Sequence, residues 1–166
     1  MRLLTIGSHV FGGPARFVEF GHAESAAFRS WVRNARPRLF PPTLVMAEVA
    51  AALSRTVSKS SLAQPYYMAV GQLPNTVMVV LDEGSAPQAA ALRAQHQLRG
   101  ADSVYLASAV LFAAELVTLD RKQLKRGAAI VQTLAPAGFL ATITWWRFSW
   151  GINCLGRFMT SASSIL

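Results

Sequence analysis

The sequence predicts an α/β domain with a central parallel sheet, because short apolar strand patterns alternate with helix patterns along most of the chain. The strongest strand pattern is residues 76–81 (TVMVVL), which are β-branched or apolar throughout. Apolarity on both faces of this segment predicts a central strand that helices cover on both sides. Hydrophobic residues make up 52% of the chain and charged residues 14%, which excludes a disordered protein.

The remaining elements follow from hydrophobic spacing. Apolar runs predict further strands, at residues 2–6, 38–40, 115–119 and 130–134. Helix patterns are expected at residues 22–34, 43–55, 85–97, 101–113 and 121–127. Residues 59–71 have a weaker helix pattern, which Pro65 interrupts.

The end of the chain differs from the rest. A chain of 166 residues is long enough for one domain with a sizeable core. Residues 141–166 hold three of the four tryptophans, the only cysteine and no periodic pattern. We therefore expect a domain at residues 1–140 and an appended basic, tryptophan-rich tail at residues 141–166. We interpret the tail as a poorly ordered segment; base stacking, packing against a partner and contact with a membrane surface are the alternatives.

Cysteine content and hydropathy indicate the compartment. One cysteine, Cys154, excludes an intrachain disulfide framework and fits a reducing compartment, so we expect a cytoplasmic protein. Residues 127–146 are uncharged and long enough to cross a bilayer. Gln132, Pro136 and Gly138 dilute their apolarity, however, so a strand followed by a turn is the better interpretation and no membrane span is expected.

The net charge of +8 is placed unevenly along the chain. Residues 121–166 hold six of the sixteen Lys and Arg residues and no acidic residue. A basic balance of this kind suits a polyanionic partner, nucleic acid first and an anionic membrane second. Four of these cations lie close together and are candidates for contacts with RNA phosphates; a solvated helix face is the alternative. They are Arg121, Lys122, Lys125 and Arg126.

Three of the eight acidic residues lie inside apolar stretches, namely Glu48, Asp102 and Asp120. An unpaired carboxylate is costly in such surroundings unless a cation or a hydrogen-bond donor meets it. If the fold brings the three together, they form a hard, oxygen-only site for Mg²⁺ or Mn²⁺. Such a site indicates metal-assisted cleavage of a phosphodiester.

Each of these acids also has a structural interpretation. Glu48 is an exposed helix residue in that account, or a salt-bridge partner of Arg55. Asp102 is a helix N-terminal aspartate, which capping and the helix dipole favour. Asp120 starts a D-x-x-Q pattern that is typical of an N-cap. It also follows a strand, where open parallel sheets place their ligands, and capping does not exclude metal binding.

The combination resembles a known family, the PIN-domain ribonucleases, and within it the VapC-type toxins of bacterial toxin–antitoxin pairs. The matching segments are 41–55 (PPTLVMAEVAAALSR), 98–128 (LRGADSVYLASAVLFAAELVTLDRKQLKRGA) and 130–140 (IVQTLAPAGFL). Residues 22–33 look like the first helix of the family, so the resemblance covers residues 17–140. The portion ADSVYLA…LVTLDRKQL is the specific part.

The resemblance implies a three-layer α/β/α domain that gathers acids around Mg²⁺ or Mn²⁺ at one edge of a parallel sheet. By motif, Glu48, Asp102 and Asp120 look like three of the catalytic and metal-binding acids of the family. Thr118 is similar to the hydroxyl residue often found two positions before the last of them; a β-branched strand residue is the alternative. The implied activity is endoribonucleolytic, with an RNA substrate, a cognate antitoxin protein and a homodimeric assembly.

The first strand departs from the family pattern. That strand normally ends in an aspartate, whereas residues 2–17 hold no acid, and the family position falls near Gly7 or His9. Loss of this carboxylate weakens the expected metal site, so a catalytically inactive module that binds an antitoxin or dimerises is the alternative function. Because both ends of the chain depart from the family, replacement by frameshift is a further hypothesis. Finding no remnant of the missing motif in another reading frame upstream would refute it.

Overall fold

The computed structural model describes residues 2–11, 23–56 and 68–144. Within them, four short strands form a parallel sheet in the order β2-β1-β3-β4, which confirms the predicted parallel sheet. The strands are β1 (Leu3–Ile6), β2 (Arg38–Leu39), β3 (Glu115–Val117) and β4 (Thr133–Leu134). Leu4 of β1 pairs with Leu39 on one side and with Glu115 on the other.

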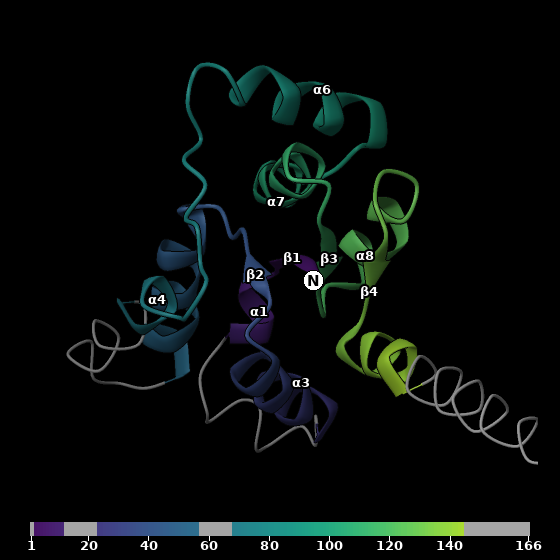
Figure 1. Cartoon of the computed structure of the whole chain (residues 1–166). Helices are drawn as coiled ribbons and strands as arrows, with labels where there is room; N and C mark the ends of the chain where they lie inside the picture. Colours follow the sequence, from purple (N-terminus) through teal and green to yellow (C-terminus); the bar gives the residue numbers. More distant parts are fainter. Residues whose placement is uncertain (1, 12–22, 57–67, 145–166) are drawn as a thin grey trace, which may run out of the picture.

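Helices cover both faces of this sheet. They are α1 (Ser8–Phe11), α3 (Ala23–Ala35), α4 (Leu44–Thr56), α6 (Ala86–His96), α7 (Gly100–Leu111) and α8 (Arg121–Gly127), and residues 68–71 and 136–144 are helical as well. In Figure 1, α6 and α7 lie above the sheet, and α3 and the helix at residues 136–144 lie below it. This is the expected three-layer α/β/α arrangement.

Two clusters of buried side chains hold the layers together. Leu116 of β3 packs with Leu106 of α7 and with Val45 and Val49 of α4. The next residue, Val117, faces the opposite layer, which includes Phe28 of α3 and Phe139. The alternation of side chains along β3 therefore supplies both cores, as expected for a strand with helices on each face.

The prediction that residues 76–81 form a central strand is wrong. The segment lies beside β2 at the edge of the sheet and makes only isolated bridges, Leu39 with Thr76 and Pro42 with Val79. Val80 is 61% exposed and Leu81 48%. In the continuation of β2, residues 39, 41 and 43 face this segment, and Pro41 has no N–H group to donate, so one hydrogen bond of the ladder between the two bridges is missing.

The helix at residues 136–144 is tied to the first strand. The Arg2 guanidinium donates to Thr142 Oγ1 at 2.9 Å and forms an ion pair of 2.9 Å with Glu115. The tail predicted from residue 141 thus starts inside this helix, and residues 145–166 lie outside the described residues. The part of the chain that the structure describes contains no helix that is long and apolar enough to cross a membrane.

Candidate metal centre

The candidate site lies where β1 and β3 end. These strands are neighbours, whereas β2 follows β1 in the chain but lies on its other side, so the strand order reverses between β1 and β3. The Gly7 N–H donates to the Val117 carbonyl oxygen at 2.9 Å, which keeps the two chain segments together just beyond the strands. Open parallel sheets bind their ligands at such a switch point.

Asp120 is the N-cap of α8, as its sequence pattern predicted. Its Oδ1 accepts hydrogen bonds from the backbone N–H groups of Lys122 at 2.7 Å and Gln123 at 3.0 Å. Its Oδ2 lies 3.5 Å from Nη1 of Arg99, at the start of α7. The α8 terminus therefore holds one carboxylate oxygen, while a largely exposed cation faces the other.

Thr118 holds the backbone between β3 and Asp120. Its side chain is fully buried, and its hydroxyl oxygen accepts a hydrogen bond of 3.1 Å from the Asp120 N–H group. Gly7 packs directly against it, because a Cβ atom at residue 7 would lie 2.9 Å from Thr118 Oγ1. Gly7, just beyond β1, has no side chain and so carries no carboxylate. Any side chain at residue 7 would require Thr118 to shift.

Asp102 lies in the first turn of α7, as predicted, and is half-buried. Burial raises the pKa of its carboxyl group, and the negative charge of Asp120 raises this pKa further. Glu48 adds a smaller contribution in the same direction, while Arg99 opposes the shift. The charges of two acids from distant parts of the sequence therefore act on Asp102.

Glu48 comes from α4 and is half-buried. The Tyr105 hydroxyl donates a hydrogen bond of 2.8 Å to its Oε2, so a hydrogen-bond donor meets this carboxylate. The Tyr105 hydroxyl also accepts hydrogen bonds from the side chain and backbone of Ser8. Burial, and then the nearby Glu48 charge, raise the pKa of Tyr105, which keeps the phenol protonated. The salt bridge to Arg55 stays an open alternative, because the Arg55 side chain lies outside the described residues.

Tyr105 and Arg99 are the residues of this site that sequence reasoning missed. Tyr105 follows Asp102 by three positions on α7, so helical geometry places both on one face. Arg99 stands three positions before Asp102, just outside the first turn. The helical spacing from Asp102 could therefore have identified Tyr105 and Arg99 as neighbours of this carboxylate. The same spacing could not predict their partners on α4 and α8.

The carboxylate oxygens of Glu48, Asp102 and Asp120 suit a hard cation, but the three side chains do not surround one. Among the described residues, no three His, Cys, Asp or Glu side chains are placed to hold one metal ion together. Mg²⁺ is often bound through only one or two carboxylates while it keeps several waters. Asp102 and Asp120, the more strongly coupled pair, fit this manner of binding.

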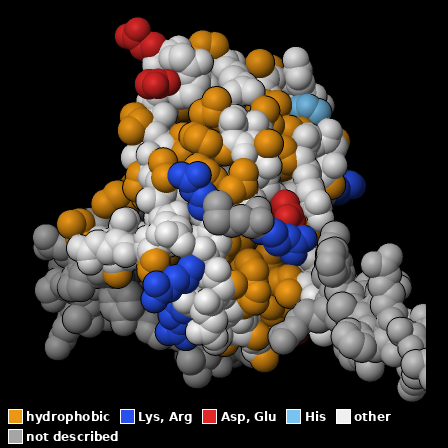
Figure 2. All heavy atoms as spheres, in the orientation of Figure 1, with side chains coloured by type: hydrophobic (Ala, Val, Ile, Leu, Met, Phe, Trp, Pro, Cys, Tyr) orange, Lys and Arg blue, Asp and Glu red, His pale blue; other side chains and the backbone are white. Residues whose placement is uncertain are grey.

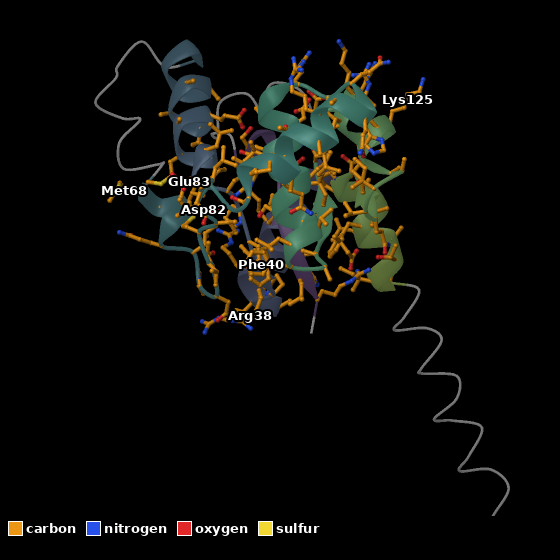
Figure 3. The ribbon with its side chains drawn as sticks, turned by 90° about the horizontal axis from the view of Figure 1, so that it is seen from above. Arg38, Phe40, Met68, Asp82, Glu83 and Lys125 are labelled. Atoms are coloured by element: carbon orange, nitrogen blue, oxygen red, sulfur yellow. The ribbon has the colours of Figure 1, made fainter. Side chains whose placement is uncertain are left out.

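Basic residues follow the site directly. Helix α8 begins one residue after Asp120, and Arg121, Lys122 and Lys125 are exposed on it. Figure 3 shows Lys125 at the opposite end of the molecule from Arg38. Figure 2 shows Lys and Arg side chains interspersed with hydrophobic ones on one face. A polyanion that approaches the carboxylates from the side of α8 thus meets positive charge.

The PIN domain family model matches residues 15–130, which is more than half of the chain. The chain belongs to the PIN domain family. The matched region contains Glu48, Asp102 and Asp120 but starts after β1 and Gly7. The family match therefore includes the segments that carry the three acids, and it does not extend over the first strand.

Solved structures share the PIN fold with this chain at low sequence identity. A toxin–antitoxin complex from Klebsiella pneumoniae is 20% identical, with a TM-score of 0.56 over 82% of this chain and 98% of that chain. VapBC2 from Rickettsia felis, bound to a DNA fragment of its promoter, is 13% identical, with a TM-score of 0.57 over 80% and 98%. FitAcB from Neisseria gonorrhoeae is 15% identical, with a TM-score of 0.59 over 80% and 97%. No curated protein matches the sequence.

Proposed function

We propose that this PIN domain is a metal-dependent endoribonuclease of the VapC type, the toxin of a toxin–antitoxin pair, with a metal site weakened by the absence of a carboxylate at Gly7. The observation that carries the proposal is that contacts from α7 reach the other two acids beside Asp102. Arg99, three residues before Asp102, pairs with Asp120, and Tyr105, three residues after Asp102, donates a hydrogen bond to Glu48. The structural neighbours support the toxin assignment, since one of them is a toxin–antitoxin complex and another is VapBC2 bound to promoter DNA.

The residues have distinct roles in this proposal. Asp102 and Asp120 hold a Mg²⁺ or Mn²⁺ ion, Glu48 assists them, and Thr118 supports Asp120 through the backbone N–H. When bound, the ion supplies an activated water and neutralises charge that develops on the phosphodiester. The RNA phosphates bind to the cations of α8, which require charge rather than a base sequence. These cations are Arg121, Lys122, Lys125 and Arg126.

RNA cleavage by matched variants tests this proposal. We expect Mg²⁺- or Mn²⁺-stimulated cleavage of single-stranded RNA that is abolished by a chelator and falls on the order of 100-fold in Asp102→Asn. Asp82→Asn is the matched control, since it removes the same charge at an exposed loop and keeps the side-chain oxygen that accepts hydrogen bonds from Gly84 and Ser85. Equal background cleavage by the wild type and Asp102→Asn contradicts the proposal.

The second candidate function is a catalytically inactive PIN module that binds an antitoxin or dimerises. It is favoured by Gly7, whose position against Thr118 leaves no carboxylate at the end of β1. Exposed hydrophobic side chains at Val80 and Leu111 are consistent with a protein partner. Absence of metal-stimulated cleavage together with intact binding of the cognate antitoxin, or with a dimer in light scattering, selects this function.

A further inference from the structure

Tyr105 joins three elements of the fold beside the carboxylates. It lies on α7, is 2% exposed, and donates a hydrogen bond of 2.8 Å to Glu48 Oε2 on α4. Its oxygen also receives hydrogen bonds from Ser8, the residue after Gly7 at the end of β1. The phenol oxygen thus has partners on two other elements, and one of them is a candidate metal ligand.

The ring of Tyr105 lies in the core, while its hydroxyl contacts an acidic side chain. Tyr105 belongs to the cluster with Val45 and Val49, so its ring packs where α4 meets α7. Its hydroxyl, however, reaches the carboxylate of Glu48 and the chain segment that leaves β1. A hydrogen bond in the low-dielectric interior is stronger than one in water, and a fully satisfied buried network makes its members rigid.

We propose that Tyr105 is a positioning residue for Glu48, which it holds in one orientation for a divalent ion. In this role the Ser8–Tyr105–Glu48 contacts link the end of β1 to the metal centre, where Gly7 supplies no carboxylate of its own. The inference rests on the proposed metal-dependent function. It assigns Tyr105 no contact with RNA or with the reacting atoms, because its side chain is buried.

Calorimetric titration of the full chain with Mn²⁺ tests this inference without any activity assay. Groups that orient metal ligands typically contribute about ten- to 100-fold to affinity, so we expect Tyr105→Phe, which keeps the ring, to bind Mn²⁺ about tenfold more weakly. In a Glu48→Gln background the same change should have little further effect, because Tyr105 acts through that carboxylate. Ser8→Ala, which removes one donor to the phenol, should cause a smaller loss and replaces Tyr105→Phe if that variant fails to fold.

Ser108→Ala is the matched structural control. Ser108 lies one turn further along α7, is buried, and donates a hydrogen bond of 2.7 Å to the carbonyl oxygen of Phe40, which is not a candidate ligand. Unchanged or tighter Mn²⁺ binding by Tyr105→Phe overturns the inference, and so does an equal loss in Ser108→Ala. If the wild type itself binds no Mn²⁺, both the positioning role and the proposed function fail. If the wild type binds Mn²⁺ and Tyr105→Phe binds it with the same affinity, only the positioning role is overturned.

Discussion

Gly7 stands just beyond β1, where the family resemblance places an aspartate near Gly7 or His9. Because a Cβ at residue 7 would lie 2.9 Å from Thr118 Oγ1 and 3.2 Å from Thr118 Cβ, a side chain there requires Thr118 to move. Thr118 in turn holds the backbone N–H of Asp120. Reinstating an aspartate at residue 7 is therefore coupled to the position of Asp120, and a second change at residue 118 belongs in any attempt to restore it.

The pKa of Asp102 predicts how the metal-free protein responds to pH. A carboxyl group whose folded-state pKa is raised makes the folded state less stable as pH rises from the ordinary pKa of 3.8 through the folded value. Above that range the penalty is constant. Asp102→Asn should therefore unfold at a higher temperature than the wild type at pH 7 in a chelator, with the difference shrinking towards acid pH.

This expectation is checked by thermal unfolding of both proteins between acid and neutral pH. Asp82→Asn serves as the control for loss of a negative charge away from the site. An Asp102→Asn protein that is less stable than the wild type at pH 7 contradicts the interpretation that burial and the Asp120 charge dominate at this carboxylate.

Among the elements, α8 depends on Asp120 for its start. The two hydrogen bonds from Lys122 and Gln123 need an acceptor at residue 120 but not a negative charge. We predict that Asp120→Ala lowers the free energy of unfolding by about 1 kcal/mol through the lost cap, and that Asp120→Asn lowers it much less. Both variants should lose Mn²⁺ affinity, because neither carries a carboxylate.

Chemical denaturation and calorimetry separate these two roles of Asp120. Equal stability of the alanine and asparagine variants argues against a capping role. Undiminished Mn²⁺ binding by Asp120→Asn argues against a role in the metal site.

The edge segment at residues 76–81 shows where element-level reasoning from sequence is limited. Val77, Val79 and Val80 have high strand propensity, and the segment does lie beside a strand. Propensity describes how well a residue fits a pleated, partly buried surface, however, and says nothing of the number of neighbours that a strand finds. Among the described residues, this segment pairs with β2 and its continuation on one side, and Pro41 leaves that pairing as isolated bridges.

The charge of the whole molecule predicts how RNA binding responds to salt. With a net charge of +8, binding to single-stranded RNA should weaken as salt concentration rises, and each lost phosphate contact should reduce the slope of log K against log salt by about 0.7. We expect Lys125→Gln, on α8, to reduce the slope by one contact. Arg38→Gln removes an exposed charge at the opposite end of the molecule and should leave the slope unchanged (Figure 3).

Fluorescence anisotropy with a short labelled RNA, in the presence of a chelator to prevent cleavage, measures these slopes. The same reduction in both variants would show that RNA contacts the surface without preference, and would remove the reason for placing the substrate along α8.

Interactions between residues close together in the chain made most of the helices and strands predictable, and they singled out each of the three acids separately. Helical spacing located α3, α4, α6 and α7, and the polar residue after an apolar strand identified Asp120 as the cap of α8. These features depend on residues within a turn or two of one another, which is why one sequence suffices to find them. The family resemblance then joined the acids into one expected site.

The sequence by itself thus determined the α/β fold class and the parallel sheet, and it singled out three acids whose role in the site stays a prediction. Only the tertiary structure decided that Tyr105 contacts both Glu48 and Ser8, that Thr118 lies against Gly7, and that residues 76–81 lie at an exposed edge. The physical reason is the distance along the chain over which each kind of interaction acts. Propensity and capping act between near neighbours in the chain, whereas burial, charge coupling and hydrogen bonds between elements depend on which distant segments the sheet order brings together.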